Sequence, residues 1–512
     1  MTWRLHPLAV ALPRIGGHRR IGLVAVAVLL AAGCSWTGGS APAGSSSAPA
    51  AGGTRPNVVL VLTDDLSMNL VQYMPHVLAL QRAGMTFSNY SVTDSLCCPS
   101  RSSIFSGKFP HDTGVFTNSG PDGGFGVFHS RGEESDTVAT DLQKAGYRTA
   151  MMGKYLNGYQ PKADLGSSHP YVPPGWSEWD VAGNGYPEYD YDLNQNGTVV
   201  HHGRTPQDYL TDVLAGKASD FVAASAAAHT PFLLEVATFA PHSPYTPAPA
   251  DKDAFPGLAA PRSPAYDTLP AGAPAWLAGH APLTARQQAT IDRDFRRRAQ
   301  AVQAVDRLLG RVEDTLAKQG VSGNTDIVFS SDNGYHMGEH RLLPGKMTAF
   351  DTDVRVPLVV AGPGIAAGST SAAVAQNIDL RPTFDQLAGL APAASVDGHS
   401  LLPLLRGQQP PGWRTAALVE HHGPDDDRTD PDHPGKGAAN PPSYEALRTA
   451  TQTYVEYSTG EREFYDRGTD PDELHDTAAA LPATTLRQLH TTLTALRGCH
   501  GSAACTTAAG GR

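Results

Sequence analysis

The chain has few cysteines, few charged residues and no apolar run long enough to stay in a membrane as a helix. Only five of its 512 residues are cysteine, too few to hold a chain of this size together by disulfides. Acidic residues outnumber basic ones by 50 to 39, and the formal net charge of −11 argues against a nucleic-acid partner. No internal repeat is visible, so we expect one large domain and a smaller terminal one.

The longest apolar run, residues 21–32, is too short for a permanent transmembrane helix. Arginines precede it and small residues end it, which predicts a secretory signal peptide over residues 1–33. The ending "LLAAGC" resembles a bacterial lipobox, so we expect acylation of Cys34, with an ordinary cleaved signal as the alternative. Residues 34–54, rich in Ser, Ala, Gly and Pro, predict a flexible tether. The mature protein is expected outside the cytoplasmic membrane, secreted or held to its outer face only by the lipid.

Short apolar runs bounded by Gly, Pro or polar residues predict strands buried on both faces of a parallel sheet. Helical segments lie between them, most clearly at 284–318, where apolar residues recur every three, four or seven positions and Gly320 marks a stop. This alternation indicates an α/β fold with helices on both faces of the sheet. The predicted strands are 57–63, 148–153, 232–239, 326–331 and 357–362.

Two polar segments contain potential metal ligands without the spacing that a metal site needs. Residues 188–203 superficially resemble a calcium loop, but Gly203 stands where a bidentate glutamate is required. We interpret its Asn196-Gly197 pair as a hairpin turn. Residues 421–443, rich in Pro, Gly and charge, predict a long exposed loop. A second metal site there is an alternative that fits no ligand scheme.

The character of the sequence changes near residue 411, which divides a predicted catalytic domain, 55–410, from a C-terminal subdomain, 411–512. In the subdomain, alternating apolar and polar residues predict a small antiparallel sheet, and an amphipathic helix follows from about residue 483 to 496. Cys499 and Cys505 are close in sequence and expected to be exported, so we expect a disulfide between them. Cys98 is then left as a single buried thiol.

Polar residues follow several of the predicted strands. Open α/β sheets bind ligands beyond the carboxyl ends of their strands, so these side chains are expected to converge. Three carboxylates and an amide at one point would repel each other unless a hard cation neutralised them, and such oxygen ligands suit calcium or magnesium. Each pair alone is an ordinary turn or helix cap, and only their combination indicates a metal. The residues are Asp64, Asp65, Asp332 and Asn333, with Lys154 and His242 at the ends of two further strands.

Adjacent cysteines rarely bond to each other, so Cys97 and Cys98 need another explanation. Cys97 begins Cys-x-Pro-Ser-Arg, and here the chain resembles the sulfatase family, whose members oxidise this cysteine to Cα-formylglycine. A helix predicted to start near Pro99 would direct its N-terminus at the site. The resemblance covers roughly residues 56–478 and is strongest to glucosamine-6-sulfatases and heparan sulfate endosulfatases. It rests on "LVLTDD", "CCPSRSSIFSGKFPH", "MMGKYLNGY", "PPGWSEW", "FAPHSPY", "SSDNGYHMGEH", "LPGKMTAFDTDVRVPLVVAGPGI" and "YDRGTDPDELHD".

The resemblance implies an alkaline-phosphatase-like α/β sandwich with a large, mostly parallel sheet and a smaller C-terminal antiparallel sheet. It implies hydrolysis of a sulfate ester on a sugar resembling N-acetylglucosamine-6-sulfate, and maturation by a formylglycine-generating enzyme that reads Cys, Pro and Arg in the unfolded chain. Calcium, with magnesium as the alternative, would be held by Asp64, Asp65, Asp332, Asn333 and the formylglycine from Cys97. Arg101 would orient the formylglycine, Lys154 and Lys346 would bind sulfate oxygens, and His242 would face the leaving oxygen.

One position departs from the broader arylsulfatase pattern. Leu156 stands where many relatives have a histidine that helps to deprotonate the formylglycine hydrate, so the base for sulfate release is unassigned. His336 and His340 are candidates, with a structural role as the alternative. Two other functions are weighed: a phosphomonoester or phosphonate hydrolase of the same superfamily, and a non-catalytic lipoprotein that binds sulfated glycans.

Overall fold

A computed structural model describes residues 55–511 of the chain. The predicted signal peptide, Cys34 and the tether lie outside the described residues. Within residues 55–511, none of the helices combines the length and the apolar character needed to cross a bilayer.

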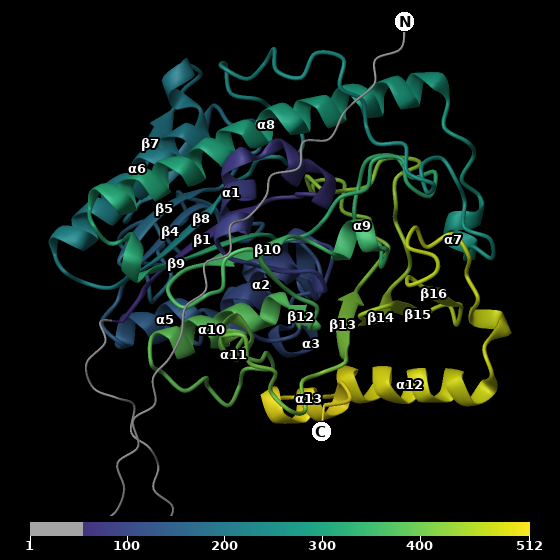
Figure 1. The fold of residues 1–512 in the computed structure, drawn as a ribbon. Helices are drawn as coiled ribbons and strands as arrows, with labels where there is room; N and C mark the ends of the chain where they lie inside the picture. The colour runs from purple at the N-terminus through teal and green to yellow at the C-terminus, as the bar shows by residue number, and fades with distance from the viewer. Residues whose placement is uncertain (1–54, 512) are drawn as a thin grey trace, which may run out of the picture. The chain divides into compact units, whose positions relative to one another are not determined.

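A ten-stranded sheet forms the centre of the described chain (Figure 1). In spatial order its strands are β11 (Ser369–Ser371), β2 (Met85–Phe87), β10 (Leu358–Ala361), β9 (Thr325–Ser331), β1 (Asn57–Thr63), β8 (Phe232–Ala237), β4 (Arg148–Lys154), β5 (Glu178–Ala182), β6 (Tyr191–Gln195) and β7 (Thr198–His202). The strands from β9 to β5 run parallel, and antiparallel pairings occur at both margins. The predicted mostly parallel sheet is therefore confirmed, and all five predicted runs form strands.

One of these strands runs in the opposite direction to the prediction. Residues 357–362 were expected to join the parallel set, but β10 pairs antiparallel with β9, with Leu358 opposite Ser330. Between the end of β9 and the start of β10 the chain forms only the short helix α9 (Asp351–Val354). Without a crossover helix the chain re-enters the sheet at the same ends of the strands where it left, so β10 runs back antiparallel to β9.

Helices cover both faces of the sheet, because successive strand residues point to opposite sides. Val59 and Val61 of β1 belong to the apolar cluster under α1 (Pro75–Ala83), α6 (Leu210–Ala227) and α8 (Ala285–Lys318). Val58 and Leu60 belong to the cluster on the other face, under α2 (Cys97–Ser106), α5 (Val138–Lys144), α10 (Leu380–Leu387) and α11 (Leu402–Leu405). The two sets of helices lie above and below the sheet in Figure 1.

The hairpin and the long helix follow the sequence prediction closely. β6 and β7 pair through a turn at Asn196 and Gly197, both with positive φ, so residues 188–203 are no calcium loop. Helix α8 begins after Thr284, whose side chain accepts a hydrogen bond from the Gln287 amide, which caps the helix.

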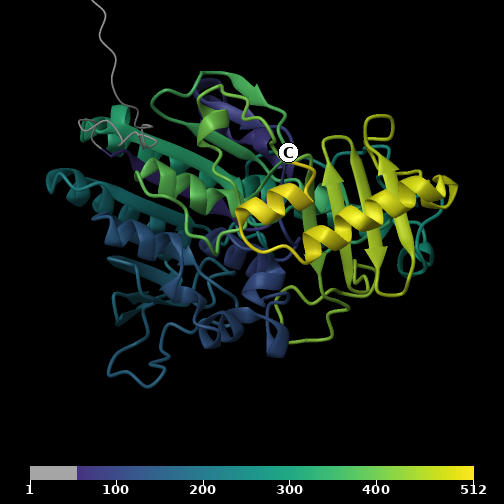
Figure 2. The ribbon, with the colours of Figure 1, turned by 90° about the horizontal axis from the view of Figure 1, so that it is seen from below.

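A second, four-stranded antiparallel sheet lies in the C-terminal part of the chain. Its strands are β13 (Ala416–His421), β14 (Tyr444–Thr449), β15 (Gln452–Tyr457) and β16 (Arg462–Asp466). Figure 2 shows α12 (Ala483–Arg497) lying across this sheet, followed by α13 (Ser502–Ala508). Cys499 and Cys505 form the predicted disulfide, and Cys98 is a buried free thiol. The domain division at residue 411 stays a prediction. The remaining short elements are β3 (Tyr90–Ser91), β12 (Ala375–Gln376), α3 (Pro110–Thr113), α4 (Gly124–Ser130) and α7 (Ala275–Ala278).

Candidate active site

The carboxyl ends of the parallel strands bring the predicted site residues together. Asp64 and Asp65 follow β1, Asp332 and Asn333 follow β9, Lys154 ends β4, and His242 lies five residues beyond β8. The strands are in register here, with Thr63 opposite Ser331 and Gly153 opposite Ala237, so the residues that follow them emerge side by side. All of these predicted side chains are buried.

Helix α2 presents Cys97 to this cluster. The helix begins at Cys97, two residues before the predicted start at Pro99, and every residue of it is buried. The Cys97 thiol donates to Asp64 Oδ1 at 3.2 Å, and Lys346 Nζ lies 2.7 Å from the sulfur. Residue 97 is therefore fixed at a helix N-terminus between a carboxylate and an ammonium group.

Arg101, one turn into α2, joins the helix to two strand ends. Its Nε donates to Asp332 Oδ2 at 2.7 Å, and its Nη1 donates to the Lys154 carbonyl oxygen at 2.9 Å. The side chain is fully buried, so it is not a surface helix arginine. Burial would raise the pKa of Asp332, but the charges of Arg101, Lys154 and Lys346 together outweigh it and lower that pKa to about 2.

Two lysines neutralise the aspartates after β1. Lys154 Nζ lies 2.6 Å from Asp64 Oδ2, and Lys346 Nζ lies 2.6 Å from Asp65 Oδ1. Burial disfavours the charged form of each lysine, yet Asp64 raises the pKa of Lys154 well above its usual range. Against the same burial penalty, Asp432 and Asp65 raise the pKa of Lys346. Both lysines are therefore charged at neutral pH and can bind an anion.

The donor set fits the hard cation that the sequence predicts. Asp64, Asp65 and Asn333 place oxygen atoms in one buried cluster, and Asn333 Oδ1 has no hydrogen-bond partner among the described residues. An orphaned buried oxygen beside two carboxylates is what a calcium ligand set needs. Asp332 also lies here: its Oδ1 accepts from the backbone amides of Asp65 and Asn333, and its Oδ2 accepts from Arg101 and keeps a second lone pair for a cation. Carboxylate, thiol and imidazole atoms of Asp64, Asp65, Cys97 and His242 lie within 4.8 Å of one another.

Sequence reasoning missed Asp432. The prediction of a long exposed loop at 421–443 is wrong for this residue, whose side chain is only 4% exposed. One of its oxygens lies 2.7 Å from His242 Nε2 and 2.9 Å from Lys346 Nζ. Burial would raise the pKa of Asp432, but Lys346 and His242 hold it well below its usual range. Asp432 is one of several acids among prolines in this segment, and nothing in the local pattern distinguishes it from its neighbours.

Asn118 and Tyr186 complete the surroundings and were also missed. Asn118 accepts from the Cys98 amide at 3.0 Å and donates to Asp432 Oδ2 at 2.8 Å. The Tyr186 ring lies 4.9 Å from Lys154 Nζ and 4.5 Å from the His242 ring. Both residues come from segments without a strong pattern of their own.

The candidates for the missing base are engaged elsewhere. Leu156 is buried in the apolar core. His336 Nδ1 lies 2.9 Å from Asp353 Oδ2, which also accepts from the Thr348 amide at 3.1 Å. His340 stacks on Phe350, and its burial lowers its pKa to about 3. These contacts are structural, and the His336–Asp353 pair orients the segment that carries Lys346.

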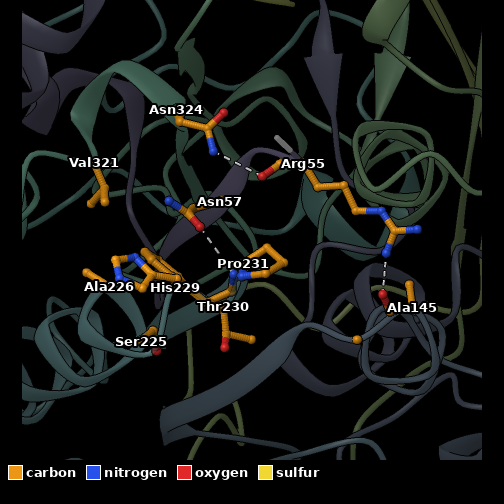
Figure 3. A pocket seen from close by; sticks show the side chains of 12 residues that line it. Arg55, Asn57, Ala145, Ser225, Ala226, His229, Thr230, Pro231, Val321 and Asn324 are labelled. Atoms are coloured by element: carbon orange, nitrogen blue, oxygen red, sulfur yellow. Dashed lines mark hydrogen bonds between the residues drawn. The ribbon is translucent and has the colours of Figure 1, made fainter. Parts of the chain in front are cut away.

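A separate cavity lies at the other end of the parallel strands (Figure 3). Asn57 and Phe232, the first residues of β1 and β8, line it together with His229. It is therefore remote from the carboxyl-end cluster and takes no part in that site.

Comparison with known proteins agrees with the geometry. The model of the family described as Sulfatase matches residues 56–390, and that described as N-sulphoglucosamine sulphohydrolase, C-terminal, matches residues 338–498. The chain is 36% identical to human N-acetylglucosamine-6-sulfatase over 97% of its own length and 93% of the relative's.

Solved structures share the fold. A protein in complex with its substrate D-glucosamine-2-N,6-O-disulfate superposes with a TM-score of 0.72 at 24% identity, over 86% of this chain and 97% of the other. The phosphonate monoester hydrolase of Agrobacterium radiobacter superposes with a TM-score of 0.65 at 22% identity, over 86% and 96%.

Proposed function

The chain belongs to the sulfatase family and is a sulfuric ester hydrolase, and we propose that it removes a 6-O-sulfate from a glucosamine-type sugar. We further propose that residue 97 acts as Cα-formylglycine beside a calcium ion. The observation that carries the proposal is the position of Cys97, with the Asp64 carboxylate and the Lys346 ammonium group against its sulfur. The substrate class rests on the relatives: the human N-acetylglucosamine-6-sulfatase and the protein solved with a disulfated glucosamine.

The chain's own residues supply the field that a sulfate ester needs. The ester is an anion, so its attack by a nucleophile depends on neutralising its oxygens and holding it in line. Lys154 and Lys346 are buried and charged, and they lie on either side of the Asp64–Asp65 pair. Arg101 fixes α2 against Asp332, which holds residue 97 in place. A formylglycine hydrate at residue 97 would supply one hydroxyl to attack sulfur, which displaces the sugar oxygen. Its second hydroxyl would lose a proton and become the aldehyde oxygen as the C–O bond to sulfate breaks.

His242 is positioned to protonate the departing sugar oxygen. Burial opposes its protonation, but Asp65 and Asp432 raise its pKa above the ordinary histidine value. A protonated His242 can donate to an alkoxide that is a poor leaving group by itself. Asp64, Asp65, Asp332 and Asn333, with residue 97, would hold the calcium ion, which when bound neutralises sulfate charge and increases the acidity of the attacking hydroxyl.

The test is a mass measurement joined to a turnover assay. In protein made alongside a formylglycine-generating enzyme, the tryptic peptide 83–101 should be lighter by the exchange of sulfur for oxygen and the loss of two hydrogens. Cys97→Ala should abolish hydrolysis of N-acetylglucosamine-6-sulfate while the protein stays folded, and Cys98→Ala should retain it. Full turnover by Cys97→Ala refutes the assigned nucleophile.

The two alternatives are not favoured. The likeness to a phosphonate monoester hydrolase shows the fold alone, since identity is 22%. A non-catalytic role disagrees with the membership of the family and with the intact set of charged residues. Comparing turnover of sulfate and phosphate esters of one sugar separates the first alternative from the proposal. Export and acylation of Cys34 remain predictions that the mass of the mature N-terminus tests.

A further inference from the structure

The segment 425–435, between β13 and β14, reaches over the site and inserts one carboxylate into it. Asp432 Oδ1 lies 2.7 Å from His242 Nε2 and 2.9 Å from Lys346 Nζ. Its Oδ2 accepts from Asn118 at 2.8 Å and lies 3.4 Å from Cys97 Sγ. A carboxylate of this chain is therefore in contact with the reacting position.

His242 and Lys346, which contact Asp432, are also the groups that a bound sulfate ester would need. In the proposed function Lys346 binds a sulfate oxygen and His242 donates to the leaving oxygen. Both already contact the same oxygen of Asp432. The carboxylate also lies against the sulfur of Cys97, where the sulfur atom of an ester would have to approach. Two anions cannot share this position, because each would be buried beside the other.

The segment also divides the space around the site. On one side lies a cavity of about 200 Å³ whose lining includes His242, Lys346 and Tyr335. On the other side lies a cavity of about 470 Å³ whose lining includes Asn118 and Tyr186. Pro431 lines both. Withdrawing the segment would join the two cavities into one cleft above residue 97.

The base and the tip of the segment are held differently. At the base, Gly423 and Ser443 exchange hydrogen bonds, and the Asp425 amide donates to Asn440 at 2.8 Å. Apart from the buried Asp432 side chain, residues 424–436 are exposed or half-exposed, and the tip is held by polar side-chain contacts such as Ser119 Oγ to Asp427 Oδ2 at 2.6 Å. A segment with so few apolar contacts opens at low free-energy cost once another anion replaces Asp432 at Lys346 and His242.

We propose that the segment 425–435 is a lid, and that the Asp432 carboxylate occupies the place of the substrate's sulfate group until the substrate displaces it. This inference rests on the proposed function for the identity of the anion. It makes Asp432 an internal competitor of the substrate. Only the fraction of molecules with the lid withdrawn binds a sulfate ester.

The first test measures the affinity of the purified protein for inorganic sulfate by calorimetry. If the lid is closed in about nine molecules of ten, Asp432→Ala should bind sulfate about tenfold more tightly. Asp426→Ala removes the same charge from an exposed position in the same segment and should leave the affinity unchanged. An unchanged or weaker affinity in Asp432→Ala overturns the proposal and makes Asp432 a ligand of the bound substrate instead.

The second test uses the unaltered chain, so it does not depend on a variant folding. Hydrogen exchange of peptides covering residues 424–436 should become faster when sulfate is added to saturation. Slower exchange would mean that the segment closes over the anion, which contradicts displacement. Neither test needs turnover. If sulfate affinity rises in Asp432→Ala but no sulfate ester is hydrolysed, the proposed function fails and the lid stands; hydrolysis without the change in affinity eliminates the lid alone.

Discussion

Three buried ion pairs hold the carboxyl-end cluster together: Lys154 with Asp64, Lys346 with Asp65, and Arg101 with Asp332. Each pairs a group from one segment with a group from another, so the charges fix the relative positions of β1, β4, β9 and α2. Removing one partner leaves an uncompensated charge in the interior, which costs far more than the loss of a surface pair.

Arg101→Met should lower the free energy of unfolding by about 3–5 kcal/mol, because Asp332 keeps its buried charge without its partner. Urea unfolding measures the difference. Arg204→Met breaks an exposed pair with Asp190 and should change the free energy of unfolding far less, because water screens that pair. Equal losses of unfolding free energy in the two variants would show that the Arg101–Asp332 pair contributes no more to stability than an exposed pair.

Calcium should raise the midpoint of thermal unfolding, because an ion that binds only the folded chain stabilises it by about 2.7 kcal/mol at a hundredfold excess over its Kd. Asn333→Ala removes the orphaned oxygen and should shrink this shift, while Asn324→Ala, remote from the site, should not. The comparison is made with calcium and then with a chelator. A shift of the same size in Asn333→Ala would remove this residue from the ligand set.

At the scale of elements, the sheet places the site by bringing strand ends into register. Strands β4 and β8 pack closely at Gly153. Its φ is +97°, and a Cβ there would overlap the carbonyl oxygen of Ala237 on β8. Any other residue would push β4 away from β8 and move Lys154, the next residue, out of reach of Asp64.

Gly153→Ala should therefore destabilise the fold by about 1–3 kcal/mol through backbone strain, and by more from the overlap. It should also weaken sulfate binding, since Lys154 is displaced. Gly126→Ala, at an exposed position in helix α4 with open space around it, should leave sulfate binding unchanged and should not lower the free energy of unfolding, because alanine favours a helix. Denaturant unfolding and sulfate titration are measured for both variants. Equal stability and equal sulfate affinity in the two variants would contradict the role of Gly153.

The strands and the main site residues were predictable because they carry a local signal: a short apolar run that ends in, or is followed closely by, a carboxylate, a lysine or a histidine. The direction of β10 was not predictable, because it depends on the absence of a crossover helix before the strand and not on the apolar residues of the strand. Asp432 was not predictable either. It contacts Cys97 across 335 residues of sequence, and its segment has the composition of an ordinary loop.

At the scale of the whole molecule, His111 links the two parts of the fold. Its Nδ1 lies 2.8 Å from Glu420 Oε2 on β13, and its Nε2 lies 2.9 Å from the carbonyl oxygen of Cys499. Burial would lower the pKa of His111, but Glu420 outweighs it and raises that pKa to about 9. The imidazole is thus charged and donates from both nitrogens.

This pairing should make stability depend on pH. A pKa raised from 6.5 to about 9 on folding contributes stability that is complete below about 6.5 and is lost as the pH rises through about 9. The difference in unfolding free energy between the unaltered chain and His111→Gln should fall by up to about 3 kcal/mol between about pH 6 and about pH 10. His490→Gln, an exposed histidine beside Glu456, serves as the control. A pH-independent difference would show that His111 is neutral.

The burial of helix α2 limits when residue 97 can be modified. No residue from Cys97 to Ser106 reaches the surface. Under the proposed function, an enzyme that recognises Cys97, Pro99 and Arg101 together would convert the thiol to formylglycine, and it could not reach these side chains once the helix has docked. The proposed conversion must therefore precede the docking of α2, and a chain that folds first would keep its thiol and remain a well-packed but inactive molecule.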